Sequence, residues 1–242
     1  MTSAITRKSQ VREWLETDIL PQYLLGVDRL VKALYDQLLT SKVKFPLLEY
    51  AASALYENVD TKDHITLCDG IAELKTIGGN VLIGIILQKR LSGHFEQSME
   101  MAAHYIAQGE EWYVTDIIGE RVYGVGLLMY PDATLKWLRQ MAKHESHWVV
   151  RAIGAGSHYA IKKGLDAEEV EKVFKLLLSL AIAKHHQIKT GIGWAAKTTA
   201  RFHQEVIAKY RSQIENKALT GQWFRTKVSI GLARGRYTKG SK

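Results

Sequence analysis

The sequence predicts an all-α fold built from paired helices. Apolar side chains recur every three to four residues through most of the 242-residue chain, which is the period of a helix with one buried face. No stretch shows the regular alternation of apolar and polar residues that marks a half-buried strand. Tryptophans recur as well: Trp148 follows Trp112 by 36 residues, and Trp223 follows Trp148 by 75. These intervals are close to one and two periods of a helix-pair repeat.

The apolar spacing places helices along the whole chain. Thr2 to Gln22 is expected to form a short amphipathic helix that ends near Pro21. Pro46 is expected at a helix start, and Gly78-Gly79 is expected to interrupt the chain between two helices. The other helices are expected at residues 30–39, 47–56, 65–74, 81–91, 95–107, 112–129, 133–142, 147–162, 170–183, 187–202, 206–214 and 223–234.

The second helix of each expected pair carries interior glycines, namely Gly119, Gly124, Gly126, Gly154, Gly156, Gly191, Gly193 and Gly231. Each costs about 1 kcal/mol relative to alanine in an exposed helix, so their recurrence indicates close helix approach or a ligand near the backbone. Helix pairs with a period near the roughly 40 residues of HEAT units predict one HEAT-like repeat domain over residues 1–242, with a helical cap at 1–25 and a basic tail at 235–242. Such an α-α superhelix is a curved solenoid, and its second helices are expected to line a concave groove.

The net charge of +8 is concentrated at one end of the chain. Residues 184–242 hold 13 lysines and arginines but only Glu205 and Glu215, whereas residues 1–183 hold 20 basic and 23 acidic residues. Scattered lysines are usually just a solvated surface. A reversal this sharp favours a basic groove that binds a polyanion.

Composition limits the other possibilities. The sequence is 46% hydrophobic and 24% charged, which is typical of a soluble globular protein, and no apolar run approaches the length of a membrane span. The single cysteine, Cys68, excludes an internal disulfide and a cysteine-based metal cluster. His185-His186 is an isolated pair, and Gly191-Ile192-Gly193 lacks the remaining glycine of a dinucleotide fingerprint. We therefore expect a cytoplasmic protein without a metal or other cofactor.

Trp112 and Asp116 are four residues apart, so on a helix they present an indole and a carboxylate side by side. In the expected array they share one groove with Arg151, Trp194 and Lys197 from later repeats. Cations in a groove can follow a phosphate backbone, and indoles can cover sugar or base faces.

Two structural interpretations remain open from the residues alone. Asp116 could serve only as the ion-pair partner of Arg121 or Arg151. Trp112 and Trp194 could belong to the core, and the small neighbours of Trp194 favour that interpretation.

Three segments resemble the AlkD family of HEAT-like DNA glycosylases. They are Trp112-Tyr113-Val114-Thr115-Asp116, Trp148-Val149-Val150-Arg151-Ala152 and Gly191-Ile192-Gly193-Trp194-Ala195-Ala196-Lys197. They occur in the family's order, and the resemblance extends over about residues 80–234. Lys197 stands where the family commonly has arginine, which keeps the charge but loses the bidentate fork. The N-terminal third has no clean equivalent of the family's early segment.

The resemblance implies a DNA-3-methyladenine/7-methylguanine-type glycosylase that acts in base excision repair. Such an enzyme excises N3-alkyladenine and N7-alkylguanine from the double helix without a deep base pocket, and it uses no cofactor. The implied catalytic residues are Asp116, Trp112 and Trp194. The expected DNA contacts come from Trp148, Arg151, Lys189, Thr190, Lys197, Arg201, Arg225, Lys227 and Arg234.

The expected partner is double-stranded DNA with alkylated bases, bound by a monomer. One alternative is a non-catalytic HEAT-like protein that recognises damaged or branched DNA. A second is a HEAT scaffold whose basic groove binds an acidic protein or RNA. Asp116 favours the enzyme over both.

Overall fold

The computed structural model describes residues 5–238, with side chains described up to residue 234. Over these residues the secondary structure is helical, and the one strand-like feature is an isolated parallel bridge between Ile5 and Val43. The all-α prediction is therefore confirmed. The expected N-terminal cap begins with residues 1–4, and the expected basic tail ends with residues 239–242, which lie outside the described residues.

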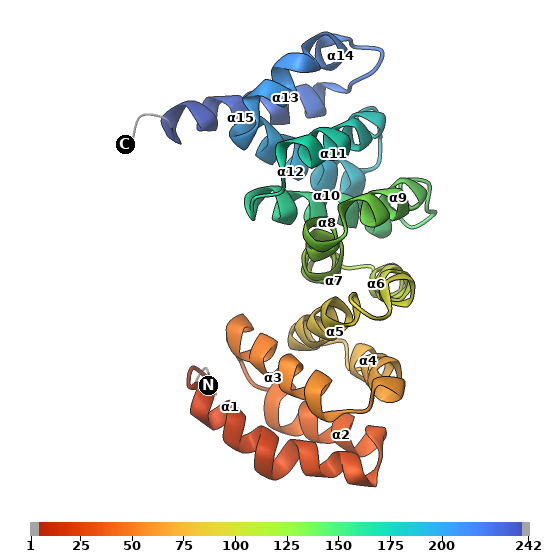
Figure 1. The fold of residues 1–242 in the computed structure, drawn as a ribbon, viewed down its shortest axis with the longest axis vertical. Coiled ribbons are helices and arrows are strands. Elements are labelled where there is room, and N and C mark those ends of the chain that lie inside the picture. Colours follow the sequence, from red (N-terminus) through yellow and green to blue (C-terminus); the bar gives the residue numbers. More distant parts are fainter. Residues whose placement is uncertain (1–4, 239–242) are drawn as a thin grey trace. The chain divides into compact units, whose positions relative to one another are not determined.

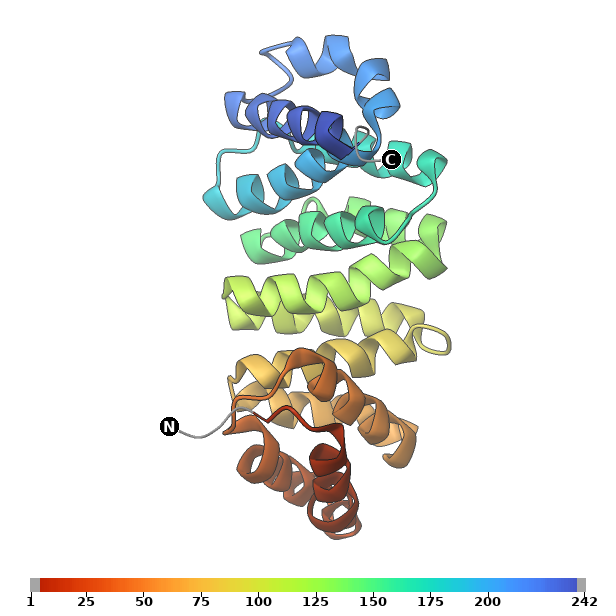
Figure 2. The ribbon, with the colours of Figure 1, turned by 90° about the vertical axis from the view of Figure 1, so that its left-hand side faces the viewer.

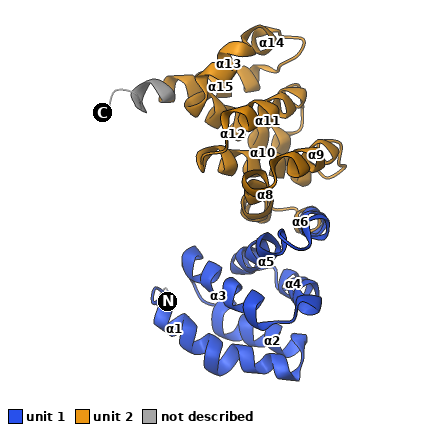
Figure 3. Ribbon diagram, in the orientation of Figure 1, with its two compact units in different colours: residues 1–105 blue, residues 106–242 orange. Residues whose placement is uncertain are grey.

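The chain divides into two compact units, residues 1–105 and residues 106–242 (Figure 3). The helices of the first unit are α1 (Lys8–Trp14), α2 (Val27–Leu34), α3 (Phe45–Asn58), α4 (His64–Glu73) and α5 (Ile77–Arg90). Shorter π or 3-10 segments complete it at η1 (Leu15–Ile19), η2 (Leu20–Leu25), η3 (Tyr35–Leu39) and η4 (Thr61–Asp63). Helix α6 (Phe95–Gly109) contains the boundary between the units.

The second unit contains all three segments that carry the candidate site. Its elements are α7 (Trp112–Gly119), η5 (Glu120–Gly124), α8 (Val125–Met129), α9 (Pro131–Met141), α10 (His147–Lys162), α11 (Ala167–Ser179), α12 (His186–Phe202), α13 (Gln204–Lys209), α14 (Arg211–Glu215) and α15 (Gln222–Thr238). Segment η5 is a π-helix, so α7, η5 and α8 form one continuous helix over the expected range 112–129.

The helix formed by α1 and η1 ends at Ile19, near Pro21 as expected, and Pro21 occupies the first turn of η2, where its missing N–H is not needed. One expected chain break lies elsewhere than predicted. Gly78 and Gly79 lie in the first turn of α5, and the interruption comes earlier, where Lys75 has a φ of 50°. The hydroxyl of Thr76 accepts a hydrogen bond from the Gly79 amide and caps α5. The prediction of a break at Gly78-Gly79 was therefore wrong.

The helices of the second unit form two layers (Figures 1 and 2). In one layer, the α7–η5–α8 helix packs against α10, α10 packs against α12, and α12 packs against α15. In the other layer, α9 contacts α11 and α11 contacts α13. Each consecutive pair, such as α9 with α10, is joined by a short connection, as expected for helix-pair repeats.

Glycines set the spacing in the layer that contains α10 and α12. A Cβ atom at Gly154 would collide with the backbone of Gly191, and a Cβ at Gly191 would collide with the carbonyl group of Arg151. Helices α10 and α12 therefore touch backbone to backbone at this level. Close approach, one of the two explanations for the recurrent glycines, applies here.

Alanine at these glycines should destabilise the protein. We expect Gly154→Ala and Gly191→Ala each to lower the free energy of unfolding by about 1–3 kcal/mol or more, because about 1–3 kcal/mol is the usual cost of overpacking. Urea denaturation measures the change. Gly93→Ala is the matched control, because a Cβ there meets nothing within 4 Å. Equal stability of all three variants would contradict the backbone contact.

Candidate functional site

The first half of the helix formed by α7, η5 and α8, residues 112–120, exposes a stripe of side chains. Trp112 is 58% exposed, and Tyr113, Asp116 and Glu120 are partly exposed. The residues between them are buried, so they fix the orientation of the stripe. The predicted pairing of Trp112 and Asp116 on one helix face is consistent with this pattern.

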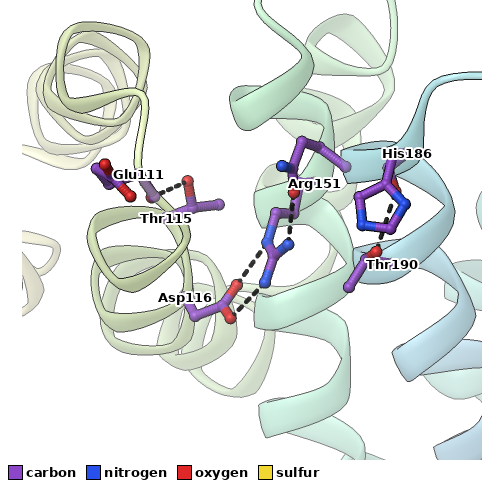
Figure 4. Close-up of polar contacts among 7 residues, drawn as sticks. Glu111, Thr115, Asp116, Arg151, His186 and Thr190 are labelled. Carbon is purple, nitrogen blue, oxygen red and sulfur yellow. Dashed lines mark hydrogen bonds and ion pairs between the residues drawn. The ribbon is translucent and has the colours of Figure 1, made fainter.

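Asp116 forms a bidentate ion pair with Arg151 of α10 (Figure 4). The guanidinium donates from Nε to Oδ1 at 2.9 Å and from Nη2 to Oδ2 at 2.7 Å. It also donates from Nη1 to Oε1 of Gln187, on α12, at 2.7 Å. The side chains of Arg151 and Asp116 are only 8% and 16% exposed. Arg121, the other candidate partner of Asp116, donates to the Ile117 carbonyl.

Arg151 is held in place from several sides. Its guanidinium lies 5.8 Å from the centre of the Trp148 ring, close enough for a cation–π interaction. Gly191 packs against its backbone carbonyl. With Asp116 and Gln187 as hydrogen-bond acceptors, the guanidinium links three successive helices of one layer. Three of its five N–H groups donate inside the protein, so Arg151 orients Asp116.

Trp194 lies partly buried on α12, stacked on the ring of His158 from α10. The ring centres are 4.0 Å apart and the planes differ by 26°. The Thr198 hydroxyl donates to the Trp194 carbonyl and lies 2.6 Å from Nδ1 of His158. Burial, then Lys162 and Lys197, lower the pKa of His158 to about 4, so the ring is neutral at pH 7.

The carboxylate and the second indole occupy different levels of this layer. His158 follows Arg151 by seven residues, which corresponds to about 10 Å along α10. Trp194 is therefore displaced along the helices from Asp116. We call the surface carried by Trp112, Asp116, Trp194 and Lys197 the site face.

Three cations lie together at the α12–α15 end of the site face. Burial lowers the pKa of Lys197, and the charges of Arg234 and Lys227 lower it further. The methylene groups of Lys227 lie along Gly193. Among the described residues, none of these three cations forms an ion pair with a carboxylate.

The remaining expected DNA contacts make local interactions. Arg225 donates to the Thr220 carbonyl and to Oε1 of Gln222, at the start of its own helix. The hydroxyl of Thr190 donates to the His186 carbonyl at 3.0 Å (Figure 4). Arg201 lies over the Phe202 ring at 5.1 Å. Lys189 and Trp148 are partly exposed near the start of α12 and α10, respectively.

Sequence reasoning did not identify four residues that belong to this face. Gln187 accepts from Arg151, and His158 with Thr198 supports Trp194. Glu120 continues the exposed stripe beyond Asp116. Helical spacing could have found two of them, because Glu120 follows Asp116 by four residues and His158 follows Arg151 by seven.

Other kinds of site have no support among the described residues. No three His, Cys, Asp or Glu side chains there are grouped so that they could hold a metal ion. None of the described helices has the length and apolar content needed to cross a bilayer. Cys68 is fully buried, which raises the pKa of its thiol.

A protein-family model described as DNA alkylation repair enzyme matches residues 43–221. This range contains the pair of Asp116 and Arg151, as well as Trp112 and Trp194. Searches of curated proteins and of solved structures gave no match.

The ion pair should contribute measurably to stability. We expect Arg151→Gln to lower the free energy of unfolding by about 2–3 kcal/mol, less than the ~3–5 kcal/mol for a fully buried pair, because Asp116 keeps some contact with water. When Asp116→Asn is added to the Arg151→Gln variant, the free energy of unfolding should fall little further. The coupling energy between the two side chains should therefore be at least about 1.5 kcal/mol. A double-mutant cycle by urea denaturation measures it. Strict additivity would show that the two side chains are not coupled.

Proposed function

The chain belongs to the DNA alkylation repair enzyme family, and we propose that it is a DNA N-glycosylase for cationic alkylated purines. Its substrates would be N3-alkyladenine and N7-alkylguanine in double-stranded DNA, and it would act in base excision repair. In this proposal Asp116 is the electrostatic catalyst, and Trp112 and Trp194 contact the sugar and backbone of the damaged nucleotide.

One observation carries the proposal: a carboxylate held rigidly beside an exposed indole. Arg151 fixes both oxygens of Asp116, while Trp112 remains 58% exposed one helical turn away. An aromatic side chain exposed to this extent is a candidate contact for a sugar or base. An ion pair needed only for stability would not require that indole beside it.

The chemistry suits such a site. Alkylation at N3 of adenine or N7 of guanine makes the base cationic and therefore a good leaving group. Breaking the glycosidic bond builds positive charge on the deoxyribose, as in other oxocarbenium-like transition states. A preoriented carboxylate stabilises this charge without reorganisation, and its effect is greater in the transition state than in the ground state. The indole faces add cation–π attraction.

DNA binding is assigned to the cations at the end of the site face. Lys197, Lys227 and Arg234 repel one another in the free protein, so an anionic phosphate placed among them relieves the repulsion. We further propose that the helix pairs form one HEAT-like solenoid through residues 1–242, with the site face lining its concave groove. The succession α7, α10, α12 and α15 within one layer supports this arrangement.

One observation favours the second candidate, a non-catalytic protein that binds damaged or branched DNA. Both oxygens of Asp116 already accept hydrogen bonds from Arg151, as in a purely structural ion pair. The cation cluster would serve that protein equally well. Release of the damaged base distinguishes the two candidates.

DNA binding should depend on salt through the cation cluster. Lys197→Gln is expected to weaken binding to undamaged and alkylated duplexes alike, and to flatten the salt slope by about one unit if Lys197 neutralises one phosphate. Lys175→Gln on α11, in the other helix layer, is the control with the same charge change. Fluorescence anisotropy at several salt concentrations measures both. If the salt dependence of DNA affinity has the same slope for the two variants, Lys197 does not contact a DNA phosphate.

Base release should depend on the charge of Asp116. We expect Asp116→Asn to slow release of N7-methylguanine about 10²–10³-fold, the scale observed when one electrostatic stabiliser is removed. DNA affinity should hold or rise slightly, because a negative charge near the phosphates is removed. Trp112→Ala and Trp194→Ala should reduce both affinity and rate.

The assay is single-turnover release of labelled base from a methylated duplex, below the unfolding temperature of each variant. Circular dichroism at the assay temperature checks folding, since Asp116→Asn leaves Arg151 without its partner. Release by Asp116→Asn at the parental rate would refute the catalytic role. No release by the parent protein would identify the non-catalytic candidate.

A further inference from the structure

A second carboxyl group lies on the site face one helical turn beyond Asp116. The amide of Glu120 donates to the carbonyl of Asp116, so the chain between them is a regular α-helical turn. Residues four apart in such a turn have Cβ atoms about 5–6 Å apart on the same face. Glu120 is partly exposed, like Asp116 and unlike the three residues between them.

The backbone on either side of Glu120 packs closely against α10. Gly119 precedes this residue, and a Cβ there would lie 3.2 Å from the Ala152 carbonyl oxygen. Gly124 follows one turn later, and a Cβ there would lie 3.0 Å from the Gly156 carbonyl oxygen. Glu120 is also the first residue of the π-helical segment η5, a local distortion often found at functional sites.

The surroundings of Glu120 differ from those of Asp116. Among the described residues, Asp116 accepts two hydrogen bonds from Arg151, whereas Glu120 takes part in no side-chain hydrogen bond. Burial raises the pKa of Glu120, the charge of Asp116 raises it further, and Arg121 and Lys162 oppose the rise.

The charged groups that shift the pKa of Glu120 come from two helices. Asp116 and Arg121 belong to the same continuous helix, and Lys162 comes from α10. Segment α8, Val125–Met129, has no titratable side chain.

We propose that Glu120 is the general base of the reaction, and that Asp116 stabilises charge without accepting the proton. This inference rests on the proposed glycosylase function. The two oxygens of Asp116 are engaged by the guanidinium, so its carboxylate is suited to act as a fixed negative charge. The Glu120 carboxylate accepts no such hydrogen bond among the described residues and lies one turn from Asp116 on the same face, and burial raises its pKa, so it is suited to accept a proton.

The step balances with water as the only co-reactant. The oxygen of a water molecule forms a bond to C1′ of the damaged nucleotide, and one proton of that water moves to the carboxylate of Glu120. The bond between C1′ and the purine nitrogen breaks, and its electron pair stays on the purine, which leaves as a neutral base. The products are the free alkylated base and an abasic deoxyribose in the DNA strand.

The experiment compares Glu120→Gln with the parent protein and with Glu111→Gln. Glu111 is exposed immediately before α7, so its substitution removes the same charge from the same helix without changing the stripe. The measurement is single-turnover release of N7-methylguanine from a methylated duplex between pH 5 and pH 9, with DNA affinity and thermal unfolding recorded for each protein.

For the parent and Glu111→Gln, we expect the rate to fall as the pH decreases through the raised pKa of Glu120. The rate of Glu120→Gln should not show this fall at low pH. At pH 7.5 this variant should release base about 10²-fold more slowly than the parent, the lower end of the usual contribution of a general base. Added formate, a small replacement base, should restore part of its rate. Its unfolding temperature should stay equal or rise, because burial disfavours the charged carboxylate it replaces.

The outcomes separate the two proposals. If the parent releases base, and Glu120→Gln has the parental rate and the parental fall in rate at low pH, then Glu120 is not the general base. The glycosylase function stands in that case. If the parent releases no base at any pH, the glycosylase function fails and the role of Glu120 fails with it. A slower Glu120→Gln with the parental pH profile also overturns the proposal, because that result indicates a structural effect.

Discussion

The backbone contact between α10 and α12 is the constraint on which the candidate site depends. Gly154 and Gly191 let two helices approach to a separation that no Cβ would allow. At that separation the arginine side chain on α10 can reach Gln187 on α12 and Asp116 on α7 at the same time. Wider spacing would break one of these hydrogen bonds and leave a buried donor unsatisfied. The glycines therefore determine the geometry of the carboxylate, although none of them touches it.

Arg151 gives the site an unusual electrostatic character. A carboxylate paired with a guanidinium has little net charge at a distance, so it repels phosphates less than a lone aspartate would. At short range its oxygens still present negative charge to a cationic centre. The same pair can therefore coexist with a polyanion bound nearby and respond to positive charge that develops on a sugar.

Helical periodicity predicted much of the second unit, because its signals are local. Trp112 and Asp116 share a face because four residues make about one turn, and the helix ranges follow from apolar spacing. The choice of Arg151 over Arg121 as the partner of Asp116 could not be made in this way. It depends on how closely α10 approaches α7, which is a tertiary property.

Other differences arose where one residue type permits two local structures. Gly78-Gly79 marked a break in the sequence pattern, yet the hydroxyl of Thr76 caps a helix that contains both glycines. The basic half of the chain predicted cations that could bind a partner, and the structure adds that Arg225 donates to the Thr220 carbonyl beside the start of its own helix. Composition locates charge along the chain and does not show which donors remain available.

The cation cluster links occupancy of the site to survival of the folded chain. The charges of Arg234 and Lys227 act unfavourably on Lys197 when no anion lies among them. Any anion that binds only the folded state stabilises it by mass action. An anion held among these three cations would therefore make the folded chain more resistant to proteases, because fewer molecules would be unfolded at any moment.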